Sequence, residues 1–260
     1  MTRNFTNMQI VARDLKQRKR GHEKEILINI GILVVLNALI VFIISLFARS
    51  CNHSIEITTQ REINIEIVPN NLPLSEKEDL VFESLKKAGF STAGACGIMG
   101  NIAVESPDYD PTAVGVGGGP YGLFQWTNVG RRKKKMQTWC EKHDVSPDSI
   151  EGQLAFAIYE IEGGDVIAVR LKDYLKSTDD AYTACAEFAA GFERCIADKN
   201  DGCGVYTGSI YPEFYGKPYQ GLNKRINKAM NYYERYKDYE ENSADNDVEQ
   251  NGNIINITID

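Results

Sequence analysis

Apolar residues recur at three- and four-residue spacings over most of the chain between positions 75 and 236, with polar residues between them. This is the period of helices that bury one face. It predicts helices within SEKEDLVFESLKKAG (75–89), TAGACGIMGNIAVES (92–106), RRKKKMQTWCEKH (131–143), IEGQLAFAIYEIE (150–162), DVIAVRLKDYL (165–175), STDDAYTACAEFAAGFERC (177–195) and LNKRINKAMNYYERY (222–236). We therefore expect a mainly α-helical domain over 75–236, with a glycine-rich loop or small β element between the second and third helices.

Local signals mark the ends of the first two helices. Ser75 and Glu78 have the spacing of a capping box, which predicts the start of the first helix. Ser91 or Thr92 can cap the second helix, and Pro107 helps to end it. Both helices therefore have boundaries that can be tested in the structure.

Three glycines, Gly94, Gly97 and Gly100, recur every third residue in the second helix. Glycine destabilises a helix interior by up to about 1 kcal/mol relative to alanine, so its repeated use requires a packing reason. We expect another part of the backbone to approach this strip closely.

Isoleucines alternate with polar residues between Ile55 and Ile67, and again in NIINITID at 253–260, which is the period of a half-buried strand. The two segments could pair with each other or with a partner's sheet edge, or they could be a stalk (49–74) and a tail. The intervening segment 237–253 is acidic and nearly devoid of apolar residues, so we expect a solvated linker within 237–260.

The segment from Ile26 to Ala48 has no formally charged residue and is long enough to cross a bilayer as a helix. Cations are concentrated before it, within 1–25, which predicts a cytoplasmic N-terminus and an extracellular C-terminal domain in a single-pass cell-membrane protein. The competing interpretation is a cleaved signal peptide ending near Ala48-Arg49-Ser50, although the apolar segment is longer than usual for one.

The formal net charge of −7 argues against general nucleic-acid binding.

The cysteines all follow position 50, where an extracellular location permits disulfide bonds. The pair that we expect first is Cys195 with Cys203. The chain has no CxxC pair, and only His53 and His143 lie on the outer side, so we expect neither a metal nor a cofactor.

Glu105 is the candidate for acid chemistry. It follows Ile98 and Ile102 on one helical stripe and lies at the predicted carboxyl end of the helix. Apolar surroundings and the helix dipole both favour its neutral form, which can donate a proton. Protonating a leaving oxygen is the task of the general acid in glycosidic bond cleavage.

A glycine-rich loop with aromatic residues, GVGGGPYGLFQWT, follows Glu105. The rings of Tyr121, Phe124 and Trp126 suit the C–H-rich faces of sugars, and the amide of Gln125 can bind an acetamido group or hydroxyls. Gly122 permits a tight turn. Alone, such a segment is more often part of a core; beside Glu105 it becomes a candidate sugar-binding loop.

Several motifs together resemble a known family. ES at 105–106, PTAV at 111–114 and YGLFQW at 121–126 are similar to the core of the goose-type lysozyme and lytic transglycosylase superfamily. The wider string, which adds EGQLAFAIYEI, FERC and the closing RINKA, resembles the phage tail lysozyme domain over about 75–236. The resemblance implies peptidoglycan cleavage between N-acetylmuramic acid and N-acetylglucosamine. Its implied roles are the catalytic acid for Glu105, support of the site for Ser106, and lining of the cleft for Gly122, Leu123, Phe124 and Gln125.

A second catalytic carboxylate is not fixed by the sequence. Asp108 and Asp110 are nearest but could simply shape the PDYDP turn. Glu187 and Glu193 could be further site carboxylates, but polar helix positions or a buried ion pair with Arg194 are the favoured interpretations. A transglycosylase, which forms 1,6-anhydro ends, needs one acid only, so both reactions remain open, and the closer resemblance favours hydrolysis.

Two further features bear on the biological role. The cations at 131–135 could contact anionic wall polymers or peptide stems, or could form a solvated helix face. A membrane anchor would confine cleavage to nearby wall, as local opening for an envelope-spanning conjugation or secretion machine requires. The alternatives from another class are a non-catalytic wall-binding scaffold and a virion tail component.

Overall fold

The computed structural model describes residues 61–198, 203–239 and 254–259. The predicted cytoplasmic segment, the predicted transmembrane helix at 26–48, the first part of the stalk and most of the acidic linker lie outside these residues. Within the described ranges, no helix combines the length and the hydropathy of a membrane span.

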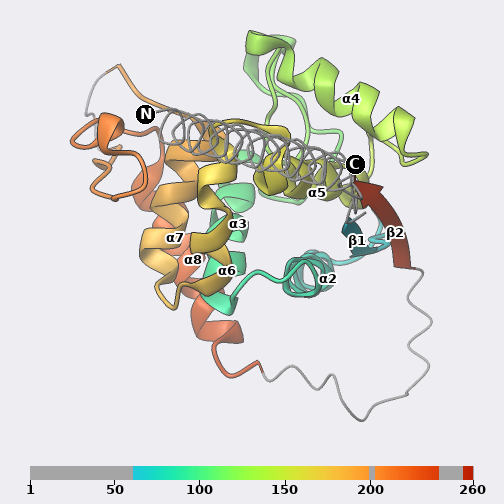
Figure 1. The fold of residues 1–260 in the computed structure, drawn as a ribbon, viewed down its shortest axis with the longest axis horizontal. Helices are drawn as coiled ribbons and strands as arrows, with labels where there is room; N and C mark the ends of the chain where they lie inside the picture. The colour runs from blue at the N-terminus through green and yellow to red at the C-terminus, as the bar shows by residue number, and fades with distance from the viewer. Residues whose placement is uncertain (1–60, 199–202, 240–253, 260) are drawn as a thin grey trace, which may run out of the picture. The chain divides into compact units, whose positions relative to one another are not determined.

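The described region is mainly helical, with one small antiparallel sheet (Figure 1). The predicted fold class of a helical domain with a minor β element is confirmed. In chain order, the elements are β1 (Arg61–Glu66), α2 (Leu74–Lys87), α3 (Thr92–Glu105), η1 (Val116–Gly118), η2 (Val129–Arg131), α4 (Arg132–Lys142), α5 (Ile150–Tyr159), η3 (Glu160–Gly164), η4 (Ala168–Leu171), α6 (Lys172–Ser177), α7 (Ala181–Phe188), η5 (Ala189–Glu193), η6 (Pro212–Phe214), α8 (Leu222–Tyr236) and β2 (Ile254–Ile259).

Helix α3 lies at the centre of the domain and contacts α2, α6, α7 and α8. Its residues are buried almost continuously from Ala93 to Ala103. The predicted cap is confirmed, because the Ser91 hydroxyl accepts a hydrogen bond from Gly94 N at 2.9 Å. The helix ends at Glu105, so the candidate acid is its last residue.

The predicted capping box of the first helix is wrong. Helix α2 begins at Leu74, after Pro73, and the cap has no side-chain hydrogen bond. Glu78 instead accepts hydrogen bonds from the Tyr232 hydroxyl at 2.6 Å and from Arg235 Nη1 at 2.9 Å, both from α8. Glu78 therefore binds side chains of α8 and does not cap α2.

The glycine strip of α3 permits the close approach that its spacing predicted. A Cβ atom at Gly94 would lie 2.0 Å from the Leu175 carbonyl oxygen, and one at Gly97 would lie 2.7 Å from Ala184 Cβ. A Cβ atom at the third glycine, Gly100, would lie 2.6 Å from the Arg225 carbonyl oxygen. The strip therefore lets three helices approach α3 closely: α6 at Gly94, α7 at Gly97 and α8 at Gly100.

Gly97→Ala should destabilise the domain by about 1–3 kcal/mol, because α3 and α7 would have to separate to admit the methyl group. Chemical denaturation measures this as a change in the free energy of unfolding. Gly119→Ala is the matched control, because a Cβ there has no heavy atom within 4 Å and the backbone φ is −95°. Equal stability of the two variants would contradict the packing role of Gly97.

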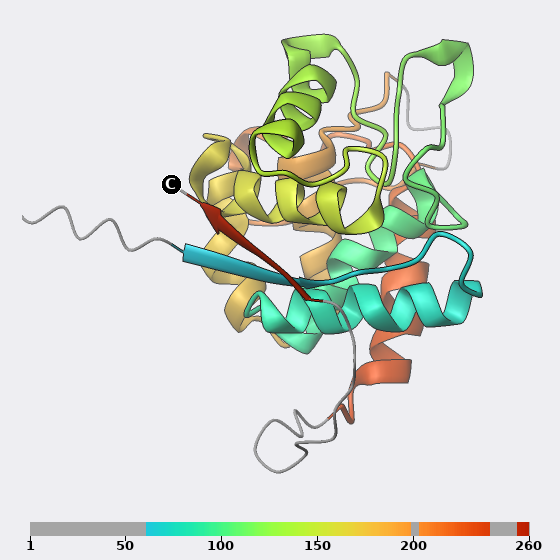
Figure 2. The same cartoon turned by 90° about the vertical axis from the view of Figure 1, so that its right-hand side faces the viewer.

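Strands β1 and β2 pair in antiparallel fashion, with Ile63 opposite Ile257 and Ile65 opposite Ile255. This outcome was one of the alternatives for the two isoleucine-rich segments. Figure 2 shows the pair lying alongside α2 and α5, with which β1 makes contact. Residues 61–66 were assigned to the stalk and 254–259 to the tail; in the structure, the burial of Ile63, Ile65 and Ile257 makes both strands part of the domain.

Candidate active site

Ser106 fixes the turn that follows Glu105. Its backbone N–H donates to the Ile102 carbonyl oxygen at 2.7 Å, which closes the last turn of α3. Its buried hydroxyl accepts a hydrogen bond from Asp110 N at 2.9 Å and donates to Asp110 O at 3.1 Å. Ser106 thus holds the backbone that leads away from the acid.

Arg225, on α8, is the partner of Glu105. Its Nη2 forms an ion pair with Glu105 Oε1, and its side chain is only 3% exposed against 18% for Glu105. Arg225 Nη1 donates to Asn101 Oδ1 at 3.2 Å, and Nε donates to the Gln220 carbonyl oxygen at 3.1 Å. The guanidinium is therefore held from three sides, and its positive charge offsets the unfavourable placement of a carboxylate at a helix C-terminus.

Asn101 orients Arg225 from one turn before Glu105. Its Nδ2 donates to the Gly97 carbonyl oxygen at 2.9 Å and to the Cys185 carbonyl oxygen at 3.2 Å. These bonds fix the amide with its oxygen toward Arg225, so α3, α7 and α8 all contribute to the position of the guanidinium.

Glu193 supplies a second carboxyl to this cluster. It ends the π-helical turn η5, and its Oε1 is buried and has no hydrogen-bond partner within the described residues. Burial and then the charge of Glu105 raise the pKa of Glu193 well above its ordinary value, while Arg225 and Arg132 act in the opposite direction. Two carboxyls therefore share the charge of Arg225, and ionising both would leave the buried cluster with excess negative charge.

The alternative partnership of Glu187 or Glu193 with Arg194 is wrong. Arg194 forms its ion pair with Asp165. Glu187 accepts hydrogen bonds from the Tyr206 hydroxyl and from two backbone amides, Ser209 N at 2.7 Å and Ile210 N at 3.0 Å. Glu187 thus stabilises the segment before η6 and is not part of the Glu105 cluster.

The loop after Glu105 is held by hydrogen bonds with its own backbone. Gly122 has a φ of +76°, and a Cβ there would lie 2.2 Å from Gln153 Oε1. Gln125 Nε2 donates to the carbonyl oxygens of Gly122 at 2.9 Å and Ala113 at 3.2 Å. Tyr121 donates its hydroxyl proton to Asp148, and Lys133 Nζ lies 4.5 Å from the centre of its ring. The Gln125 nitrogen that was predicted to bind sugar therefore closes the loop.

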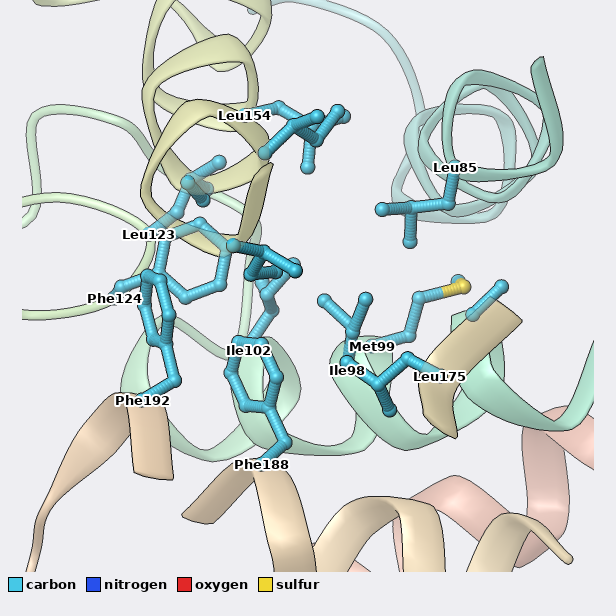
Figure 3. Packing of buried hydrophobic residues seen from close by; sticks show 14 of the residues in the cluster. Leu85, Ile98, Met99, Ile102, Leu123, Phe124, Leu154, Leu175, Phe188 and Phe192 are labelled. Carbon is cyan, nitrogen blue, oxygen red and sulfur yellow. The ribbon is translucent and has the colours of Figure 1, made fainter. Parts of the chain in front are cut away.

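Phe124 and Trp126 are core residues, which contradicts their predicted role as an exposed sugar platform. They are 3% and 2% exposed. The ring of Phe124 lies 5.1 Å from that of Phe192, and the ring of Trp126 lies 5.7 Å from that of Phe156. Figure 3 shows Phe124 beside Phe192, with Ile102 and Phe188 close by. These rings fasten the loop to the segment that carries Glu193.

Asp108 and Asp110 lie in the exposed turn after α3. Asp110 Oδ1 accepts hydrogen bonds from Thr112 N at 2.8 Å and from Thr112 Oγ1 at 2.7 Å, which is a turn-shaping arrangement. The carbonyl oxygen of Asp108 accepts from Lys77 Nζ at 3.4 Å. These contacts favour the turn interpretation of PDYDP.

The structure does not contain the expected Cys195–Cys203 disulfide bond. Cys195 Sγ instead faces the carbonyl oxygens of Gln220 at 3.7 Å and Ala189 at 3.9 Å. Its side chain is directed toward the backbone that precedes α8, where it packs beside the Arg225 cluster.

Comparison with known proteins identifies the family of the chain. The sequence profile described as phage tail lysozyme matches residues 76–236, more than half of the chain. The chain belongs to the phage tail lysozyme family. Membership indicates a lysozyme-like enzyme that acts on peptidoglycan, and the matched region spans the elements that carry Glu105, Glu193 and Arg225. Comparison with curated proteins finds no match.

Arg225 and Asn101 of this phage tail lysozyme domain were not among the site residues predicted from the sequence. Both carry a usable signal, because each polar side chain occupies an otherwise apolar helical stripe: Arg225 lies between Leu222 and Ala229 at helical spacing, and Asn101 is one turn from Gly97. Nothing in the local pattern distinguishes Glu193 from Glu187, because only the tertiary fold brings one of them to Glu105.

Glu193→Gln should alter how the stability of the lysozyme domain depends on pH. The pKa of Glu193 is raised in the folded chain above its ordinary value of 4.5, so the folded state retains a proton that the unfolded state releases. Wild type should lose stability relative to the variant by up to about 1.4 kcal/mol per pH unit as the pH rises above that value. Thermal unfolding of both proteins across this range measures the effect, and a pH-independent difference would contradict it.

Proposed function

We propose that the domain is a muramidase that hydrolyses the bond between N-acetylmuramic acid and N-acetylglucosamine, with Glu105 as the general acid. The observation that carries the proposal is the cluster of Glu105, Arg225 and Glu193 at the carboxyl end of α3. It supplies two interacting carboxyls and one buried cation beside the loop that follows Glu105. Such paired titratable groups are typical of glycosidase sites.

In this mechanism the raised pKa of Glu193 keeps a proton within the cluster. Glu105, the more exposed partner, transfers a proton to the glycosidic oxygen as the bond to the muramic acid anomeric carbon breaks. The N-acetylglucosamine end leaves as an alcohol. Water then adds to the oxocarbenium-like carbon and returns its proton to a carboxylate of the cluster, which restores the starting charge.

Arg225 acts as a positioning residue. It holds Glu105 through the ion pair and stabilises the carboxylate that forms when the proton has left. Its other hydrogen bonds, to Asn101 and to the Gln220 carbonyl oxygen, hold the guanidinium in position while the substrate binds. Loss of Asn101 would therefore affect catalysis through Arg225.

Purified peptidoglycan tests the proposal. The full chain should release soluble glycan fragments, and Glu105→Gln should not, because the amide keeps the size of the side chain but has no transferable proton. Equal digestion by both proteins would remove Glu105 from the mechanism. Products with 1,6-anhydro ends would assign the domain to the lytic transglycosylases instead.

The anchored location is the second part of the proposal. The apolar segment 26–48 would hold the enzyme at the membrane, so that it opens wall only where an envelope-spanning machine assembles. Cells expressing the full chain should release fewer wall fragments than cells that secrete a version lacking 1–50 with equal activity. Equal release would show that confinement is not the purpose of this segment.

A further inference from the structure

A pocket lies between α4 and α5, two helices that contact each other. Its volume is about 550 Å³. Four cations line it, Arg131, Lys134, Lys135 and Lys142. The whole chain has a net charge of −7, so this concentration of positive charge is a local property.

The α4–α5 pocket also has aromatic lining residues. Trp139, Phe156 and Tyr159 all line it. The rings of Trp139 and Tyr159 are stacked with their centres 5.3 Å apart, and the ring of Phe156 lies 5.8 Å from that of Trp139. A ligand that fits this pocket has apolar groups for the rings and negative charges for the cations.

The only acid that lines the α4–α5 pocket is already neutralised. Glu160 Oε2 forms an ion pair with Arg132 Nη2 at 2.7 Å, and Arg132 Nε donates to Glu160 Oε1 at 3.3 Å. Arg131, Lys134 and Lys135 have no acidic partner among the described residues. The positive charges of these three side chains are therefore available to a ligand.

The same ion pair connects the pocket to the Glu105 cluster. Arg132 Nη1 donates to the Phe192 carbonyl oxygen at 2.9 Å, and its guanidinium lies 4.8 Å from the centre of the Phe192 ring. Phe192 directly precedes Glu193, whose pKa responds to the charges of Arg132 and Glu160. One ion pair thus separates the pocket from the carboxyls, which places the two on the same part of the domain.

We propose that the α4–α5 pocket binds the acidic peptide stem of the glycan strand that Glu105 cleaves. Stems branch from muramic acid, the sugar at the cut bond, and carry both carboxylates and aliphatic side chains. In the intact strand the lactyl carboxyl of muramic acid is bonded to the stem, so the sugars themselves carry no charge. The stem is therefore the part of the substrate that matches both the cations and the rings of the pocket. The inference rests on the proposed function, because it assigns a further part of the same substrate.

Cleavage assays with the full chain test the inference on three substrates: strands with stems, strands stripped of stems by an amidase, and strands whose stem carboxylates have been amidated. Wild type should show a KM about three- to tenfold lower for acidic stems than for the other two. Lys134→Gln with Lys135→Gln, both exposed, should abolish this difference and leave the turnover number unchanged. The control is Lys228→Gln with Lys237→Gln, two exposed lysines outside the pocket.

Equal KM values for the three substrates in wild type, or an equal KM rise on all three in the Lys134/Lys135 variant, would overturn the stem assignment. Competition by a soluble phosphate-rich wall polymer, lost in that variant and independent of stems, would assign the pocket to that polymer instead. Calorimetric binding of a muramoyl-peptide to Glu105→Gln should likewise weaken when Lys134 and Lys135 are replaced. Because binding needs no turnover, a wild type that cleaves no substrate would refute the proposed function, and the calorimetric comparison would still decide the role of the pocket.

Discussion

Glu105→Gln should lower the rate of glycan cleavage by about 10²–10⁴-fold, the usual contribution of a positioned proton donor. The amide can still accept a hydrogen bond from Arg225, so the fold and the binding of the strand should change little. Release of dye-labelled fragments from purified wall measures the rate, and thermal unfolding checks the fold. The loss should appear in the turnover number rather than in KM.

Glu76→Gln is the matched control for this result, because Glu76 is an exposed glutamate in the first turn of α2. It should digest wall at the wild-type rate. A Glu105→Gln protein that retains most of its activity would mean that another group donates the proton, and Glu193 would be the first to examine.

Among the substitutions proposed here, Arg225→Met should lower the free energy of unfolding the most. Removing one partner of a buried ion pair typically costs about 3–5 kcal/mol, because the remaining charge loses its compensation in a poorly solvated place. Here two carboxyls, Glu105 and Glu193, depend on the same guanidinium. The loss should therefore be greater at about pH 8 than at about pH 5, because the raised pKa of Glu193 lets that carboxyl take up a compensating proton at the lower pH.

Urea denaturation at the two pH values measures this loss, and a double variant identifies its cause. Adding Glu105→Gln to Arg225→Met should recover part of the lost stability, although Glu105→Gln alone should not stabilise the chain to the same extent. Strictly additive effects, or a loss that does not depend on pH, would show that Arg225 matters for packing rather than as a counter-charge.

Features that rest on neighbouring residues could be predicted from the sequence. The Ser91 cap, the end of α3 at Glu105 and the close approach at Gly94, Gly97 and Gly100 all follow from local backbone and steric requirements. Glu105 could be chosen as the candidate acid because an ionisable group on an apolar stripe is unusual wherever the helix packs.

Features that depend on contacts between distant residues could not be predicted from the sequence. The pairing of β1 with β2 joins the two ends of the described region, so the sequence could offer it only as one alternative. Glu78 satisfied the local rule for a capping box, but α8 supplied stronger partners. Phe124 and Trp126 have the composition of a sugar platform, and only the positions of Phe192 and Phe156 show that they are buried.

The candidate site likewise combines one residue that the sequence indicated with others that only the tertiary fold brings to it. Its acid came from the sequence, whereas its counter-charge comes from α8 and its second carboxyl from the π-helical turn η5. π-helical turns are often found at functional sites, and this one ends at the residue whose carboxyl interacts with Glu105. The three groups are far apart in sequence, and only the tertiary fold brings them together.

Digestion of purified peptidoglycan in water labelled with heavy oxygen tests the central claim most directly. Mass spectrometry of the wild-type products should find the label at new reducing N-acetylmuramic acid ends, and the same digest with Glu105→Gln should contain almost none of these products. Unlabelled 1,6-anhydro ends would contradict hydrolysis, and labelled products formed equally fast without the Glu105 carboxyl would contradict its role as the proton donor.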